Sequence, residues 1–160
     1  MEHQHTRAHQ SGDVHYRQLL IMLALSFAVM YALMYAMVDD FANVFNSVNQ
    51  VYMAALMAAP MGIIELAVMR SMYANRRLNL LVVGGSAIVL ALAWFGIRQQ
   101  VAIGDAQFLR SMIPHHAGAI LMCEEAPIHD AGIKALCQSI IASQQAEIVQ
   151  MKAKLAALAR

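Results

Sequence analysis

The chain has 160 residues, of which 60% are hydrophobic and only 13% are charged. Soluble domains usually hold about 45–50% apolar and about 25% charged residues, so this balance argues against an ordinary soluble protein. The formal net charge of +1 gives no basis for a nucleic-acid partner. The apolar excess is concentrated in long uncharged runs, which are typical of membrane spans, and the lipid bilayer is therefore the first partner we expect.

Residues 1–18 are polar and follow neither a helical nor a strand period, so they predict a solvated tail. Four histidines fall in this stretch, namely His3, His5, His9 and His15. Their spacing fits no defined metal site, and a histidine-rich tract is only compositional evidence for metal binding. The apolar run that follows is too long for a secretory signal peptide and lacks a small-residue cleavage site.

Three apolar runs come next, at residues 19–38, 51–69 and 78–97, and each has about the 20 residues needed to cross the hydrocarbon core. They predict three transmembrane helices within a membrane region at residues 19–97. Small residues in the second and third runs predict close approach of neighbouring helices. These small residues are Ala54, Ala55, Ala58, Ala59 and Gly62, followed by Gly84, Gly85 and Ser86.

One acid, Glu65, lies inside a predicted span. A carboxyl group within the membrane is costly and is by default a functional candidate. The alternative is a residue near the interface that reaches towards Arg70 or water. Glu65 also falls in a stripe that repeats every four residues with Met53, Met57, Met61 and Met69. Such a stripe either passes a soft metal across the bilayer or fills irregular apolar gaps.

The arginines predict the orientation of the chain in the membrane. They are concentrated in the N-terminal tail, at Arg7 and Arg17, and in the link after the second run, at Arg70, Arg76 and Arg77. The link after the first run carries two acids instead. The positive-inside rule then places the N-terminus in the cytoplasm and everything after the third run outside, with Arg98 as a single opposing charge.

Residues 98–160 predict an antiparallel hairpin of two helices. The first helix would start with Asp105 as its N-cap and end before Pro127, and the second would run from near Asp130 to Leu158. A hairpin of about 55 residues buries little core on its own. We therefore expect a homodimer in which two hairpins complete a four-helix bundle.

The stretch from Met112 to Cys123 combines the side chains that soft metals prefer. It reads Met-Ile-Pro-His-His-Ala-Gly-Ala-Ile-Leu-Met-Cys, and at about 100° per residue its donors lie on or beside one broad helix face. Thioether, imidazole and thiolate groups are the protein ligands that Cu(I) selects. The candidate metal ligands are Met112, His115, His116, Met122 and Cys123, with Cys137 and Met151 on the second helix.

The hairpin geometry predicts which residues meet. Folding about Pro127 would bring the second helix against the first, and this register leaves room for a cluster of Met112, His116, Gln144 and Glu147. The same register would offset Cys123 and Cys137 by about five residues, or roughly 7–8 Å of axial rise. A disulfide would then be awkward, and two separate thiols or a pair across a dimer are the alternatives.

The pattern of these residues resembles a known family. The matching positions are Asp105, Phe108, Met112, Ile113, His115, His116, Ala119, Ile120 and Met122, then Gln144, Glu147, Ile148 and Met151. Over about residues 105–158 they resemble the bacterial family catalogued as domain of unknown function 305. The resemblance implies a ferritin-like helical fold that usually faces the periplasm, with copper binding in some relatives and no established enzymatic reaction. Where many relatives have alanine, this chain has Cys123 and Cys137.

Three functions follow as hypotheses. The first is a metal-binding protein anchored in the bacterial inner membrane that sequesters or transfers copper on the periplasmic side, with zinc, bound by the histidines and cysteines, as second choice. The second is a structural module whose hairpin only dimerises or docks, with the histidines as core residues. The third is an enzyme, but a di-iron site of this kind needs a Glu-x-x-His spacing, which Glu125 and His129 do not have. No catalytic site is predicted.

Overall fold

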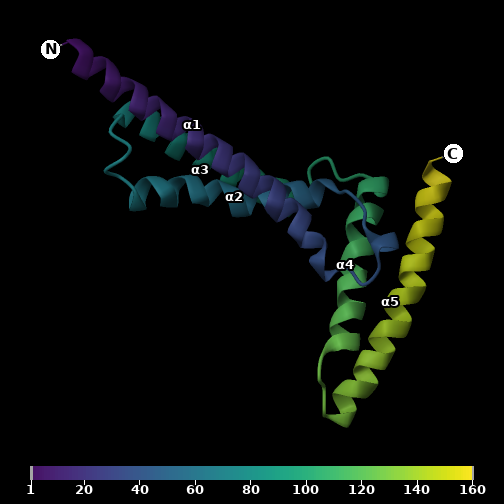
Figure 1. Ribbon diagram of the computed structural model, residues 1–160. Coiled ribbons are helices and arrows are strands. Elements are labelled where there is room, and N and C mark those ends of the chain that lie inside the picture. Colours follow the sequence, from purple (N-terminus) through teal and green to yellow (C-terminus); the bar gives the residue numbers. More distant parts are fainter. Residues whose placement is uncertain (1, 160) are drawn as a thin grey trace. The chain divides into compact units, whose positions relative to one another are not determined.

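The computed structural model describes the backbone of residues 2–159 and the side chains of residues 14–159, and this part of the chain consists of helices joined by short links, with no strand (Figure 1). The predicted all-α class is confirmed. The helices are α1 (Glu2–Leu33), α2 (Val48–Val68), α3 (Arg76–Arg98), α4 (Asp105–Glu125) and α5 (Ala131–Leu158). Two short 3-10 helices, η1 (Met34–Met37) and η2 (Phe41–Asn43), lie between α1 and α2.

The polar N-terminal stretch continues the first apolar helix. Because α1 begins at Glu2, its backbone is helical although its sequence has no helical period. Extending an existing helix costs much less than nucleating a new one, which accounts for the continuation. The side chains of His3, His5 and His9 lie outside the described residues.

Three helices in the described part of the chain are long and apolar enough to cross a membrane. They cover Val14–Met37, Val48–Val68 and Arg76–Arg98. The three predicted runs coincide with them to within a few residues at each end. The prediction of three candidate spans is thus confirmed by length and composition.

The described residues form two compact units, each made from two separate stretches of the chain. The first unit contains the chain up to Ala32 together with Val51–Val101. The second contains Leu33–Gln50 together with the chain from Ala102 onward. The link between the first two spans therefore belongs to the same unit as the hairpin.

Small residues bring α2 and α3 together in the first unit. A Cβ placed on Gly62 would lie 2.9 Å from the Ser86 hydroxyl oxygen, so a larger residue there would force the Ser86 side chain to move. By contrast, a Cβ on Gly84 or Gly85 would meet nothing within 4 Å. The predicted close packing is confirmed at Gly62 and Ser86, whereas the prediction for Gly84 and Gly85 was wrong, since the space beside them is open.

Polar contacts hold the loop between α2 and α3 against α1. The Tyr16 hydroxyl donates to the Asn79 side chain at 2.6 Å and to the carbonyl of Asn75 at 3.2 Å. The Asn75 side chain also caps α3 by accepting from the backbone N–H groups of Arg77 and Leu78. Tyr16 packs edge-on against the ring of Tyr73, 5.1 Å between centroids.

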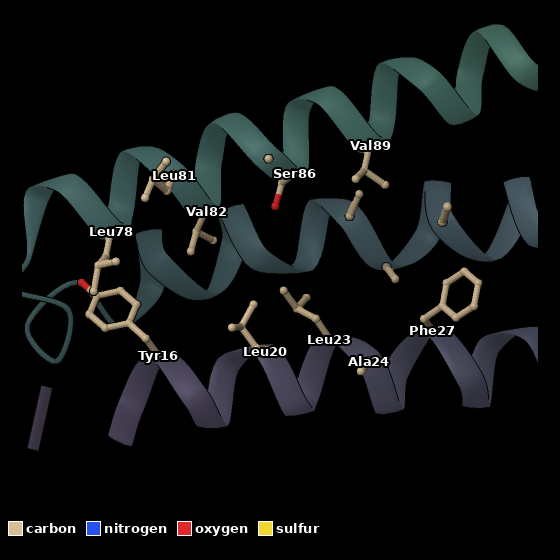
Figure 2. A pocket seen from close by; sticks show the side chains of 14 residues that line it. Tyr16, Leu20, Leu23, Ala24, Phe27, Leu78, Leu81, Val82, Ser86 and Val89 are labelled. Carbon is tan, nitrogen blue, oxygen red and sulfur yellow. The ribbon is translucent and has the colours of Figure 1, made fainter. Parts of the chain in front are cut away.

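An apolar groove of about 590 Å³ lies among α1, α2 and α3 (Figure 2). Leu20 and Phe27 of α1 face it from one side, and Leu78 and Val82 of α3 face it from the other. The apolar lining of this groove suits the acyl chains of a bilayer, as expected if the three apolar helices lie in a membrane.

In the second unit α4 and α5 lie side by side and run in opposite directions (Figure 1). Their shared core consists of Ile113, Ala117, Ile120 and Ile148. Val38 and Phe45 from the first link pack against this core. The link backbone is also close to α4, since a Cβ on Gly118 would lie 3.3 Å from the Met37 carbonyl oxygen.

The helix ends of the hairpin match the predictions with one correction. Asp130 caps α5, because its side chain accepts from the backbone N–H of Ile133 at 2.8 Å. The prediction that Asp105 caps α4 was wrong: the N-cap is Gly104, and Asp105 is the first helical residue. An acid at that position still faces the positive end of the helix dipole, so the sequence signal was real but displaced by one residue.

Candidate functional site

The two adjacent histidines of α4 lie in different environments. His116 is only 9% exposed and is flanked by the buried Ile113, Ala117 and Ile120, whereas His115 is exposed. Their ring centroids are 6.1 Å apart, and the ring planes are tilted by 58°. Successive residues of a helix point about 100° apart, so only one histidine of the pair can face α5.

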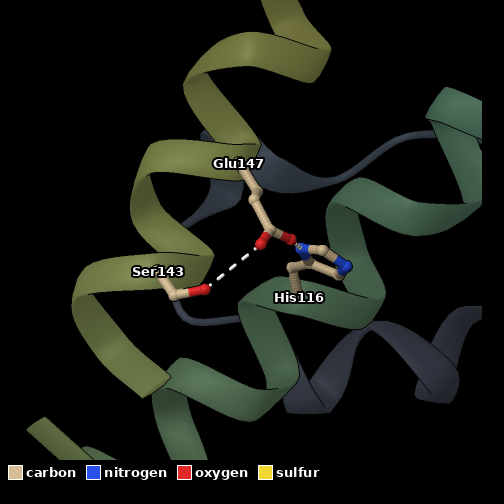
Figure 3. A network of polar contacts seen from close by, with 3 residues as sticks. All are labelled: His116, Ser143 and Glu147. Carbon is tan, nitrogen blue, oxygen red and sulfur yellow. Dashed lines mark hydrogen bonds and ion pairs between the residues drawn. The ribbon is translucent and has the colours of Figure 1, made fainter. Parts of the chain in front are cut away.

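Glu147 of α5 meets the buried histidine. Its Oε2 lies 3.2 Å from Nδ1 of His116, while its Oε1 accepts a hydrogen bond from Ser143 Oγ at 3.1 Å (Figure 3). The Nδ1 atom is buried and is not aligned for a hydrogen bond. The Glu147 carboxylate therefore lies close to the imidazole ring without forming a well-directed hydrogen bond to it. Ser143, one turn before Glu147, was not predicted; its spacing of four residues from Glu147 is the signal that could have identified it.

Burial keeps His116 neutral. Desolvation lowers the pKa of its imidazole below the ordinary value of 6.5, and the nearby His115 lowers it further. The Glu147 carboxylate acts in the opposite direction but does not reverse the shift. A neutral imidazole has a free lone pair on one ring nitrogen, which is the form that binds a metal.

Two methionines lie one helical turn from this pair. Met112 precedes His116 by four residues on α4, and Met151 follows Glu147 by four residues on α5. Because α4 and α5 are antiparallel, Met112 and Met151 both lie one turn farther from the link than His116 and Glu147 do. Both methionines are half-buried, and Met151 packs against the hairpin core, whereas Met122 is 54% exposed.

The two cysteines lie on the two helices of the hairpin, towards the link. Both are free and half-buried, and the side chain of Cys137 raises the pKa of Cys123. The register predicted by folding about Pro127 was wrong, because His116 meets Glu147. The link from Ala126 to Asp130 is extended and α5 starts at Ala131, so the helices pair about a point beyond Pro127.

Five of the seven candidate ligands therefore fall in two places rather than one. His116 lies with Glu147 beside the turn that carries Met112 and Met151, while Cys123 and Cys137 lie about two turns, or roughly 10 Å, nearer the link. His115 and Met122 are exposed. No group of three or more His, Cys, Asp or Glu side chains converges as a metal site among the described residues.

Glu65, the acid within the second span, has a hydrogen-bond partner in the described chain. The Tyr73 hydroxyl donates to Glu65 Oε1 at 3.4 Å, and Glu65 lies in the last turn of α2. This position favours the interpretation of Glu65 as a residue near the membrane interface. In the methionine stripe, Met53, Met57 and Met69 are exposed, which a lipid-facing surface also explains.

Comparison with known proteins places the hairpin in a family. Residues 96–155 match the family described as Domain of unknown function (DUF305). The uncharacterized protein L153 of Acanthamoeba polyphaga mimivirus is 34% identical over 110 residues, which cover 68% of this chain and 70% of that protein. No solved structure matches the chain significantly. The matched residues contain all the candidate ligands.

Proposed function

The chain belongs to the domain of unknown function 305 family, and from this premise we propose that it is a membrane-anchored protein that binds copper, as Cu(I), and sequesters it or passes it on. The observation that carries the proposal is the buried His116, kept neutral and fixed beside Glu147, with two thioethers on the adjacent turn. The chain needs no catalytic group for this function.

The arrangement around His116 supports a soft metal. A histidine that binds metal through one nitrogen commonly turns its other nitrogen towards a carboxylate, and Glu147 occupies that place beside Nδ1. Nε2 is then the metal-binding nitrogen, and the half-buried Met112 and Met151 supply thioether sulfur. Imidazole with thioethers selects Cu(I). Zinc, the second choice, would need imidazole, carboxylate and thiolate groups to converge, and no three such groups do so in the described chain.

We place the protein in the bacterial inner membrane, with its N-terminus in the cytoplasm and the hairpin in the periplasm. Three helices of sufficient length and hydropathy support the membrane location. Arg70, Arg76 and Arg77 between α2 and α3 support the orientation, because positive residues are retained on the cytoplasmic side.

A second copy of the hairpin would complete a ferritin-like four-helix bundle. Ile133 and Leu136, three residues apart on one side of α5, are 50% and 57% exposed, and Ile148 is the buried residue of that helix. An apolar surface of this kind on a short hairpin favours association. The same observation supports the alternative function, a membrane-anchored docking module whose hairpin binds a second copy or another protein and no metal.

The test uses the whole chain in detergent micelles, because Val38 and Phe45 of the first link are part of the hairpin core. The starting protein carries Cys123→Ser and Cys137→Ser, which removes thiol binding. Cu(I) is titrated anaerobically against a competing chelator. Glu147→Gln should weaken binding by about 10- to 100-fold, and His116→Ala should weaken it at least as much.

His115→Ala and Met122→Leu are the matched controls, since both residues are exposed neighbours of the proposed ligands. They should leave the affinity unchanged, whereas Met151→Leu should lower it. Equal losses for His115→Ala and His116→Ala would contradict the site. Absence of Cu(I) binding in the starting protein would favour the docking module.

A further inference from the structure

The apolar groove of the first unit is a space that its own side chains do not fill. Figure 2 shows α1 and α3 as the two walls, with α2 running between them. The residues of α2 that line the groove are all small, namely Ala55, Ala58 and Ala59. Gly85 of α3 also lines it, and a Cβ at that position would meet nothing within 4 Å. Leu20 and Leu81 on the two walls are exposed, so the groove opens outward between α1 and α3.

The groove is about as long as one leaflet of a bilayer is thick. Its lining runs from Tyr16 to Phe27 on α1 and from Leu78 to Val89 on α3, and at 1.5 Å per residue each stretch is about 16 Å long. The hydrocarbon core of a bilayer is about 30 Å thick, or about 15 Å for each leaflet. Tyr16 and Leu78 lie at one end of the groove, and Phe27 and Val89 lie towards the other (Figure 2). One acyl chain of a single leaflet therefore fits along the groove.

Arginines gather at the Tyr16 end of the groove. The Tyr16 hydroxyl donates to the Asn79 side chain at 2.6 Å and to the Asn75 carbonyl at 3.2 Å, which holds the start of α3 beside α1. Three exposed arginines flank this contact in the sequence, namely Arg17, Arg76 and Arg77. A basic group thus stands where the apolar lining ends.

Few acidic residues offset this charge. Glu65 is the acidic side chain that the structure describes in the first unit, and it already accepts a hydrogen bond from Tyr73. Asp13 precedes Arg17 by four residues, and its side chain lies outside the described residues. Arginine binds a phosphate group through two parallel N–H···O hydrogen bonds. The charge at this end therefore matches the phosphate of an anionic lipid, just as the groove matches its acyl chain.

We propose that the groove binds one anionic phospholipid, with an acyl chain between α1 and α3 and the phosphate at Arg17, Arg76 and Arg77. Basic pockets between membrane helices on the cytoplasmic side are suited to anionic head groups. With the orientation proposed above, these arginines lie on that side. The inference rests on the membrane location in the proposed function and does not involve the copper site.

The test uses the full-length protein, exchanged into lipid-free detergent and then incubated with phosphatidylglycerol or with phosphatidylethanolamine of the same acyl chains. Native mass spectrometry counts the lipids that each chain retains. We expect one phosphatidylglycerol per chain, retained in preference to phosphatidylethanolamine. Arg77→Gln should lower this preference by about fivefold. Arg98→Gln is the matched control, because it removes the same charge from an exposed position at the opposite end of α3, and it should keep the preference.

A second pair of variants tests the groove itself. Gly85→Leu places a side chain in the groove without a clash at its Cβ, and it should reduce the retention of both lipids. Gly84→Leu is the same change at a neighbouring open position that does not line the groove, and it should retain lipid as the wild type does. Equal retention of the two lipids by the wild type, or undiminished retention by Gly85→Leu, would overturn the proposal. A dimer that Gly85→Leu dissociates, with no lipid retained by the wild type, would assign the groove to a second copy of the chain instead.

The Cu(I) titration separates this inference from the proposed function. Gly85→Leu and Arg77→Gln should keep the wild-type affinity for Cu(I), because neither residue belongs to the hairpin. Absence of lipid selectivity in a wild type that still binds Cu(I) and still needs detergent would refute the lipid site alone. A protein that stays in solution after the detergent is removed would refute the membrane location, and the lipid site with it.

Discussion

The aromatic ring of Tyr52 on α2 lies directly over Gly96 on α3. A Cβ on Gly96 would be 2.8 Å from both Cε1 and Cζ of the ring. The Tyr52 hydroxyl donates to the carbonyl of Val101 at 2.9 Å, and the backbone N–H of Val101 donates to the carbonyl of Gly96 at 2.9 Å. Val101 thus binds both the Tyr52 hydroxyl and the Gly96 carbonyl. The Tyr52 ring can move away from Gly96 only if its hydrogen bond to Val101 is disturbed.

Gly96→Ala should consequently destabilise the first unit by about 1–3 kcal/mol, the usual cost of forcing extra volume into a packed site. Gly85→Ala is the control, because it is the same change on the same helix in open space; it should be neutral or stabilising by up to about 1 kcal/mol. Unfolding of the micelle-bound protein in increasing SDS measures both. Equal midpoints for the two variants would show that the ring moves aside.

Asp130→Ala should loosen the start of α5. The change removes the hydrogen bond that the side chain accepts from the N–H of Ile133, and loss of such a cap costs about 0.5–2 kcal/mol. Asp105→Ala is the matched change at the start of α4, where the side chain makes no cap bond; only its interaction with the helix dipole, about 0.3–1 kcal/mol, is lost. Hydrogen exchange should show faster opening of the first turn of α5 in the first variant.

The lowered pKa of His116 predicts a hairpin that weakens in acid. Above the unfolded pKa, about 6.5, the imidazole is neutral in both states and costs nothing. As the pH falls below that value, the unfolded chain takes up a proton that the folded chain resists, so stability falls until the pH reaches the folded pKa.

His116→Gln should remove this part of the acid sensitivity. Thermal unfolding between about pH 7.5 and pH 5, followed for the wild type and for this variant, gives the comparison. His115→Gln serves as the comparison: it removes only the smaller contribution of His115 to the lowered pKa of His116, so it should keep most of the acid sensitivity, because the burial of His116 is unchanged. A wild-type profile as flat as that of His116→Gln would contradict the prediction.

Single cysteines placed in a Cys123→Ser/Cys137→Ser background should report the proposed orientation. Ala126 lies in the hairpin link and Ser71 in the loop between α2 and α3, and both are exposed. In intact cells a membrane-impermeant maleimide should label Ala126→Cys and leave Ser71→Cys untouched. After the membrane is permeabilised, both should react. The reverse pattern would invert the topology.

The helices were predictable from sequence because their signals are local. A run of about 20 apolar residues is decided by length and hydropathy, and the ends of α4 and α5 are marked by Gly104, Pro127 and Asp130. His116 and Glu147 were predicted only as members of a possible cluster with Met112 and Gln144, and the direct contact between the two was not predicted. Close packing at Gly84 and Gly85 was not predictable, since composition does not say which helix face meets a neighbour.

The register of the hairpin could not be obtained from sequence. A proline ends a helix but does not say where the next helix begins, and the extended residues after Ala126 move the pairing point towards Ala131. A displacement of a few residues changes every partner. It places Glu147 beside His116 and reduces the offset that was expected between Cys123 and Cys137.

The packing of Val38 and Phe45 against the hairpin core has a consequence for biosynthesis. The ribosome completes these two residues long before it reaches Ile113 or Ile148. Through the insertion of α2 and α3, their apolar side chains therefore have no native partner to cover them. The second unit can be completed only after the last helix has left the ribosome. A chain that is halted after the third span would therefore expose the apolar side chains of Val38 and Phe45. Quality-control proteases could recognise this exposed segment.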